Sequence, residues 1–179
     1  MGYCELQITS NFSFLEGASH PEELIERAAQ LGYHAVAVTD RNSFAGIVRA
    51  HIAAKKEGIR LIPACRLDLQ DGPSLLAYPT DKEAYGRLSS LLTVGNLRTE
   101  KGKCKLYKAD VYSYAEGIIF VVCPPEELTE EFELDYSFVE FVKECRQHLH
   151  GSLNLGIKKL YRGDDAKKLY RINQLGEQL

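Results

Sequence analysis

Short runs of apolar, often β-branched residues alternate along the chain with longer segments in which apolar residues recur every three or four positions. A short run between turn-forming residues is typical of a buried strand, and the longer period is typical of an amphipathic helix. The alternation predicts an α/β fold. The predicted strand regions are Tyr3–Ile8, Ala35–Val38, Ile59–Leu69, Leu75–Tyr78, Ile118–Cys123 and Leu153–Ile157.

The first predicted helix begins at Ser19, because the Ser19 hydroxyl can bind the amide three residues on while the Glu22 side chain bonds back. Pro21 suits the first turn, and Gly32 can adopt the left-handed conformation that ends a helix. Further helices are predicted over Phe44–Lys56, from a capping box at Thr80 and Glu83, around Phe138–Cys145, and over Asp164–Gln178.

Three segments interrupt the alternation. Asp71-Gly72-Pro73 predicts a turn that returns the chain as an antiparallel hairpin or a bent edge. The polar segment Gly95–Lys105 predicts a loop, and the acidic segment 126–135 predicts a solvent-facing connection. None of them resembles an interdomain linker, so residues 1–179 are expected to be part of one domain. Because a strand would normally follow the last helix, we expect a fold truncated on its C-terminal side.

The composition is that of a folded protein, since 45% of the 179 residues are hydrophobic and 26% are charged. A net charge of −3 gives no attraction of the whole surface to nucleic acid. The longest apolar run, Ile118–Cys123, is far shorter than the roughly 20 residues that cross a bilayer, and no cationic leader precedes the first strand. We therefore expect a cytoplasmic protein without membrane contact.

Functional side chains in parallel β/α folds gather on loops at the carboxyl ends of the strands. Here these loops span residues 7–19, 38–43 and 63–67. The chain contains no GxxxxGK[ST] phosphate loop, no GxSxG nucleophile elbow and no paired zinc motif. Any catalytic site would therefore have to be built from the residues of these three loops.

The loop sequences resemble a known family. Residues 11–24 (NFSFLEGASHPEEL) and 39–51 (TDRNSFAGIVRAH) are similar to the N-terminal polymerase-and-histidinol-phosphatase (PHP) domain of bacterial C-family DNA polymerases, the replicative alpha-subunit family, and especially to its error-prone branch. The similarity continues through residues 67–81 and 95–104. It implies a PHP-type distorted (βα)7 barrel. It also implies a parent DNA-directed DNA polymerase, a nucleotidyltransferase of DNA replication, DNA damage repair and translesion synthesis.

Metal-bearing members of the family take ligands from a His-x-His at the first strand, an acid in the next loop, an Asp-His after the second strand and a Glu after the third. By resemblance, these positions fall on Gln7, Thr9, Glu16, Asp40, Arg41 and Arg66. Gln7 and Thr9 are weak ligands, and the two arginines stay protonated. We predict a vestigial site with no metal, no other cofactor and no catalytic residue. In it, the arginines are expected to neutralise Asp40 and Glu16.

Basic residues also crowd the predicted central loop. A locally positive loop could contact a DNA phosphate backbone, although a solvated loop explains the same charges. The residues in question are Arg98, Lys101, Lys103 and Lys105.

Three functions are compatible with these observations. The leading hypothesis is a non-catalytic, structural PHP domain of an error-prone DNA polymerase. Its partners would be the remainder of the polymerase chain, DNA through the full-length protein, and other replication or repair proteins. The second is an active metal-dependent phosphoesterase or proofreading nuclease, against which the ligand replacements argue. The third is a stand-alone protein-interaction module derived from the domain. The leading hypothesis predicts that this segment alone is inactive.

Overall fold

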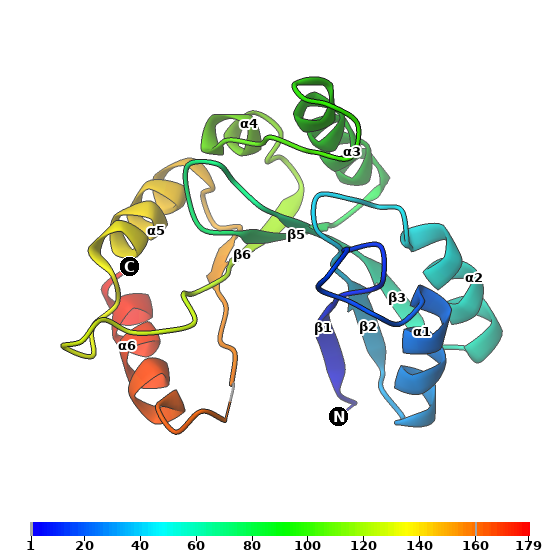
Figure 1. Ribbon diagram of the computed structural model, residues 1–179, viewed down its shortest axis with the longest axis horizontal. Coiled ribbons are helices and arrows are strands. Elements are labelled where there is room, and N and C mark those ends of the chain that lie inside the picture. Colours follow the sequence, from blue (N-terminus) through cyan, green and yellow to red (C-terminus); the bar gives the residue numbers. More distant parts are fainter. Residues whose placement is uncertain (1, 160) are drawn as a thin grey trace.

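The computed structural model describes residues 2–159 and 161–179, with helices on the outer side of the strands (Figure 1). The strands are β1 (Cys4–Ile8), β2 (Ala35–Val38), β3 (Arg60–Pro63), β4 (Cys65–Leu67), β5 (Leu75–Pro79), β6 (Ile118–Val122) and β7 (Leu153–Leu155). The helices are α1 (Pro21–Gln30), α2 (Ile47–Glu57), α3 (Lys82–Leu97), α4 (Lys108–Ser113), α5 (Tyr136–His148) and α6 (Asp165–Gln178).

The strands form two sheets. β1, β2 and β3 are parallel neighbours in a three-stranded sheet. In the four-stranded sheet β4-β5-β6-β7, the first two pairs are antiparallel and the last pair is parallel. The predicted α/β class and the hairpin at residues 71–73 are confirmed. A closed (βα)7 barrel is not confirmed, because the two sheets follow an arc that is open on one side (Figure 1).

The predicted strand Ile59–Leu69 divides into β3 and β4, which belong to different sheets. Ala64, the residue between them, is fully buried. The chain changes partner here, because β3 pairs with β2 in parallel whereas β4 pairs with β5 antiparallel. An apolar run does not indicate which neighbour each of its halves will join, so the sequence pattern predicted one strand region where the structure has two strands.

Separate hydrophobic cores hold the helices against each sheet. α1 and α2 cover the three-stranded sheet around Ile25, Val36 and Ala50. The helices of the second half cover the four-stranded sheet around Leu88 and Phe120. These buried positions follow the helical and strand periods of the sequence, which explains why the elements themselves could be predicted. Within the described residues, no helix is both long and apolar enough to cross a membrane.

The start of α1 differs from the predicted capping box. His20, not Ser19, precedes the first helical residue, and the His20 backbone N–H donates to Oε2 of Glu23 at 2.8 Å. Glu22, which was expected to make this contact, forms an ion pair with Arg49 of α2 instead. The capping box is therefore present but shifted by one residue, because a tertiary contact holds Glu22.

The start of α3 is shifted in the same direction. The Asp81 carboxylate accepts a hydrogen bond from the backbone N–H of Ala84 at 2.7 Å. The Thr80 hydroxyl, predicted to cap this helix, donates to the carbonyl of Gly117 at 2.7 Å. Thr80 thus ties β5 to the segment before β6, and Asp81 takes over the cap.

The central segment contains more helix than the sequence pattern predicts. α3 continues to Leu97, so the predicted loop Gly95–Lys105 begins inside a helix. The short helix α4 was not predicted. Its first turn depends on contacts that include a distant residue, because Lys108 N–H donates to Oδ1 of Asp71 at 3.0 Å and Tyr107 N–H donates to Oδ2 of Asp110 at 2.9 Å.

Two further boundaries differ from the prediction. α2 begins at Ile47 rather than Phe44, whose ring instead stacks on Tyr85 at 4.7 Å between centroids. β7 ends at Leu155, two residues before the predicted end. Contacts between elements again decide where each element begins or ends.

The acidic residues of segment 126–135 are exposed, as predicted, and two of them also pair with basic residues. Oε2 of Glu126 lies 3.1 Å from Nη2 of Arg162, and Glu133 forms an ion pair with Arg171 of α6. The buried Lys168 ammonium also donates to the Glu126 carbonyl. Acidic and basic segments separated in sequence therefore balance each other at this side of the molecule.

The packing at Gly72 gives a first prediction. A Cβ added there would lie 2.3 Å from Cε2 of Phe141, which is buried under the hairpin. Gly72→Ala should therefore lower the free energy of unfolding by about 1–3 kcal/mol through overpacking. Gly86→Ala is the matched control, since nothing lies within 4 Å of its added methyl group and Gly86 is inside α3. The control should raise stability by up to about 1 kcal/mol. Urea denaturation measures both, and equal stabilities would contradict the packing.

Candidate functional site

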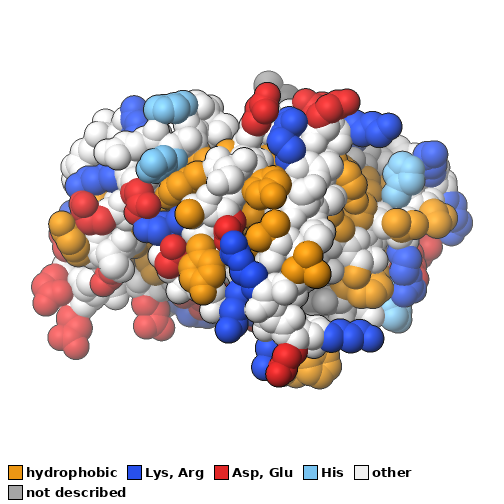
Figure 2. Space-filling model, turned by 90° about the horizontal axis from the view of Figure 1, so that it is seen from above, with side chains coloured by type: hydrophobic (Ala, Val, Ile, Leu, Met, Phe, Trp, Pro, Cys, Tyr) orange, Lys and Arg blue, Asp and Glu red, His pale blue; other side chains and the backbone are white. Residues whose placement is uncertain are grey.

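The candidate site lies where the loops after β1 and β2 meet β4. Glu16 comes from the first loop, Asp40 and Arg41 follow β2, and Arg66 and Asp68 lie in and just after β4. Arg41 and Arg66 form a parallel bridge between the sheets. Figure 2 shows Lys and Arg side chains beside Asp and Glu side chains near the middle of the face seen from above, with hydrophobic groups around them.

Asp40 is 1% exposed and binds the loop after β1. Its carboxylate accepts hydrogen bonds from the Ser10 backbone N–H at 2.8 Å, from the Ser10 hydroxyl at 2.7 Å and from the Ser13 hydroxyl at 2.8 Å. The predicted pairing of Asp40 with an arginine is therefore wrong. The serine donors satisfy this buried carboxylate locally, and the arginines bind other acids.

Asp68, which was not selected from the sequence, is the acid that binds both arginines. Nε of Arg41 donates to Oδ2 of Asp68, and Nε of Arg66 donates to Oδ1 at 2.9 Å. Arg41 also binds Glu16, with 2.6 Å between Nη1 and Oε1. The expected pair with Glu16 is present, and Asp68 has the role that was expected of Asp40. We call Glu16, Arg41, Arg66 and Asp68 the ion-pair cluster.

The contacts of the cluster shift the pKa values of its members. Burial by itself would raise the pKa of Asp68, but the hydrogen bond from Ser74 and the charges of Arg41 and Arg66 outweigh burial and lower that pKa. The hydrogen bond to Asp68 raises the pKa of Arg41. Residues two apart on an extended segment share a face, so the Arg66-x-Asp68 spacing was the signal that could have identified this pair.

Gln7 and Thr9 occupy the remaining positions that resemble metal ligands. Gln7 borders the inner cavity, and its backbone N–H donates to Oε1 of Glu5 at 3.1 Å. Thr9 is half-buried at the end of β1. Within residues 2–159 and 161–179, no group of three or more His, Cys, Asp or Glu side chains could hold a metal ion. The donor set does not fit a divalent cation, because two of the ligand positions carry guanidinium groups.

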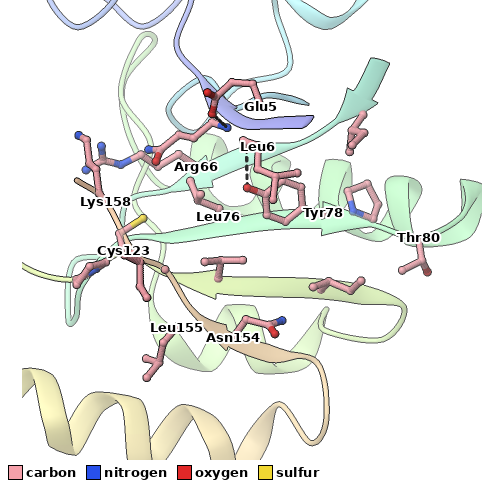
Figure 3. Close-up of a pocket in the computed structure, with 18 of the residues that line it drawn as sticks. Glu5, Leu6, Arg66, Leu76, Tyr78, Thr80, Cys123, Asn154, Leu155 and Lys158 are labelled. Atoms are coloured by element: carbon pink, nitrogen blue, oxygen red, sulfur yellow. Dashed lines mark hydrogen bonds between the residues drawn. The ribbon is translucent and has the colours of Figure 1, made fainter. Parts of the chain in front are cut away.

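A cavity of about 820 Å³, which was not predicted, lies on the inner side of the arc. Figure 3 shows its apolar wall of Leu6, Leu76 and Tyr78, with Arg66 and Lys158 close together at one end. The Tyr78 hydroxyl donates to the Leu6 carbonyl at 2.7 Å and so joins the two sheets. Burial raises the pKa of Tyr78. Segments distant in sequence build these walls, which is why periodicity could not predict the cavity.

Arg98, predicted as a phosphate contact, is bound within the fold. Its Nη2 lies 2.7 Å from Oδ1 of Asp110, and its Nη1 binds the other carboxylate oxygen. The guanidinium carbon also lies 5.6 Å from the centroid of the Tyr107 ring. Arg98 therefore fastens α4 to the end of α3.

The lysines of the same loop are exposed. Lys103 pairs with Glu100 at 3.6 Å, and Lys101 and Lys105 lie at the surface. The structure therefore separates the predicted phosphate contacts into one structural arginine and three surface lysines.

The amino-acid sequence of this chain matches a known protein family. Residues 5–126 match the family model described as the PHP domain, and the chain therefore belongs to the PHP domain family. An error-prone DNA polymerase of Caulobacter vibrioides is 47% identical over 175 residues, which are 97% of this chain and 16% of that protein. Error-prone DNA polymerase 3 of Agrobacterium fabrum is 52% identical over 130 residues, 72% of this chain and 12% of that protein.

Solved structures share the fold. A predicted metal-dependent phosphoesterase of Bifidobacterium adolescentis superimposes with a TM-score of 0.69 over 98% of this chain and 85% of that chain. The two sequences are only 15% identical, so this likeness concerns the fold alone. In this chain, the same fold contains the ion-pair cluster.

The hydrogen bonds of Asp40 generate a second prediction. Asp40→Ala should lower the free energy of unfolding by about 3 kcal/mol, because buried donors of Ser10 and Ser13 lose a charged acceptor. Asp40→Asn should cost less, about 1–2 kcal/mol, since its amide oxygen still accepts one hydrogen bond. Urea denaturation at pH 7 measures both variants. A loss below about 0.5 kcal/mol for Asp40→Ala, the size typical of a surface site, would show that the network is unimportant.

The lowered pKa of Asp68 generates a third prediction. A carboxylate whose folded-state pKa is lowered stabilises the fold above its unfolded pKa, near pH 4, and loses this effect as the pH falls through the folded-state pKa. Asp68→Asn should cost about 2 kcal/mol at pH 7, and the difference from wild type should shrink below about pH 4. Urea denaturation between neutral and acidic pH measures this. Exposed Glu100→Gln is the control, and a pH-independent difference for Asp68→Asn would contradict the assignment.

Proposed function

We propose that this chain is a non-catalytic, structural PHP domain of an error-prone DNA polymerase that acts in DNA repair and translesion synthesis. The ion-pair cluster carries the proposal, because Arg41 and Arg66 stand at positions that resemble metal ligands and both bind Asp68. The similarity to error-prone DNA polymerases over most of the chain supports an error-prone DNA polymerase as the parent protein.

The cluster balances its own charge. Two guanidinium groups, of Arg41 and Arg66, face two carboxylates, of Glu16 and Asp68. A divalent ion about 4 Å from one guanidinium would be repelled by about 8 kcal/mol at an effective dielectric constant of 20. The carboxylates would also have to leave their arginines before they could bind the ion. The arginines thus neutralise the acids and join the loops, but they cannot activate a water molecule as a metal does.

An active metal-dependent phosphoesterase or proofreading nuclease is the competing function, and the Bifidobacterium adolescentis protein that shares the fold carries the first of these descriptions. That chemistry needs neutral imidazoles and carboxylates around the metal. Gln7, Thr9 and the two arginines do not supply them. A stand-alone interaction module is the third possibility, but the match to 16% of a longer polymerase favours a role inside such a chain.

Within the polymerase, we infer that the two sheets form part of a distorted (βα)7 barrel. β1 and β7 are edge strands of their sheets, and residues of both border the apolar cavity, which supports the pairing of further strands there. The remainder of the polymerase is then the main partner, in the cytoplasm, with other replication or repair proteins as additional partners. DNA binds through the full-length protein, and exposed Lys101, Lys103 and Lys105 are the proposed phosphate contacts.

Metal analysis tests the non-catalytic assignment. After extensive dialysis, the purified chain should contain far less than one Zn, Mn or Fe per molecule by elemental analysis. It should hydrolyse neither p-nitrophenyl phosphate nor single-stranded DNA when Mn²⁺ is added, because the cluster excludes the cation. A stoichiometric metal, or turnover that a chelator abolishes, would establish the phosphoesterase instead.

A reconstructed ligand set is the control for this test. The variant carries Gln7→His, Thr9→His, Arg41→His and Arg66→Glu, which removes both positive charges and adds metal-binding groups. Calorimetry should detect Zn²⁺ binding to it. Arg41→Lys/Arg66→Lys keeps both charges and should not bind Zn²⁺. If the lysine variant bound equally well, charge at these positions would not be what excludes the metal.

A further inference from the structure

The loop between β1 and α1 presents two large apolar side chains at its tip. Phe14 and Leu15 are 85% and 90% exposed, more than any other large hydrophobic side chain in the described part of the chain. One exposed apolar residue is ordinary at a protein surface, but two adjacent ones on a well-bonded loop are not explained by the fold. The ion-pair cluster does not include them, and the proposed structural role does not explain their exposure.

Hydrogen bonds hold the base of this tip. The backbone N–H groups of Glu16 and Gly17 both donate to the Ser13 carbonyl at 3.0 Å and close a tight turn. The Ser13 hydroxyl donates to buried Asp40 and accepts the Arg41 backbone N–H at 2.9 Å. The loop is therefore presented in a defined conformation, and binding at its tip would cost little ordering entropy.

The backbone of Leu15 is strained. Its φ is 64°, in the left-handed region that glycine and asparagine adopt more easily than leucine. Glycine at this position would relieve the strain and remove the exposed apolar surface together. Strained residues of this kind are concentrated where a side chain serves a function. The leucine side chain therefore points to a contact outside the described fold.

The charges near the tip favour an apolar protein surface as the partner. Glu16 and Arg41, which brace the loop, neutralise each other. Phe12, 38% exposed on the same loop, adds a third apolar side chain. Binding to DNA or to an anionic membrane would need cations free to meet phosphate groups. The charged residue next to the tip is the acid Glu16, which does not meet that need.

We propose that Phe14 and Leu15 form an anchor that inserts into an apolar pocket on the part of the polymerase chain outside these 179 residues. The inference rests on the proposed function, since it takes the chain to be one domain of a longer polymerase. The relatives, of which this chain covers 12% and 16%, contain ample protein to supply the pocket. A few buried aromatic and aliphatic side chains commonly dominate such contacts. The pair between Arg41 and Glu16 then positions the anchor.

Photo-crosslinking in the full-length polymerase tests the anchor. Phe14 is replaced by benzoyl-phenylalanine, and Val48, 67% exposed on α2, receives the same probe as a matched control. The probe at position 14 should crosslink within one polypeptide to a peptide outside residues 1–179, identified by mass spectrometry. The control should give about tenfold less of this product, as expected for a site outside the contact. Equal yields, or capture only of a second copy or of another protein, would overturn the proposal.

Substitution provides an independent measurement. Phe14→Ser/Leu15→Gly should leave the melting temperature of the 179-residue chain unchanged or higher, because the strain at Leu15 is relieved. In the full-length polymerase, it should speed proteolysis of the domain junction several-fold, and Val48→Ser/Ile52→Ser should not. Deleting residues 1–179 separates the two ideas. If the deletion destabilises the polymerase and the tip variant does not, only the anchor fails; if the deletion has no effect, the structural role and the anchor both fail.

Discussion

The two sheets are joined where the chain passes from one to the other, and the ion pair between Arg41 and Asp68 lies at this junction. Arg41 follows β2 in the three-stranded sheet and Asp68 follows β4 in the other, so the pair joins them where the chain changes sheets. Backbone hydrogen bonds reinforce this junction, since Asn42 N–H donates to the Arg66 carbonyl at 2.8 Å and Arg66 N–H donates to the Asp40 carbonyl at 3.1 Å. The ion pairs of the site and the backbone hydrogen bonds between the two sheets therefore both involve Arg66.

Buried and exposed acids are stabilised differently at this junction. Asp40 is buried and is satisfied by serine and backbone donors, whereas Glu16 and Asp68 are more accessible and bind guanidinium groups. A buried charge is tolerated only when hydrogen bonds replace its water, and Asp40 meets that condition. As a result, the loop after β1 is held firmly, and the charges of the ion-pair cluster cancel. Arg41 braces the loop after β1, and Arg66 borders the apolar cavity. Both features suit protein contact.

Local pattern was enough to predict most of the elements. The runs 35–38 and 118–122 became strands because they are apolar, β-branched and bounded by turn residues. Contacts from distant residues decided what the pattern missed. Thr80 is drawn to Gly117 and leaves the cap of α3 to Asp81, and α4 begins where Asp71 binds its first backbone amide. The division of the predicted strand 59–69 likewise depended on which neighbours each half could pair with.

At the candidate site, the sequence by itself determined the family, because long ordered motifs carry the resemblance. It also indicated that an arginine at this site would neutralise Glu16, which Arg41 does. Only the tertiary structure decided that Asp68, and not Asp40, binds the arginines. That choice depends on the loop after β1, which folds back over β2 and brings Ser10 against Asp40. The direction of a side chain depends on which donors surround it in space, and neither spacing nor composition records those donors.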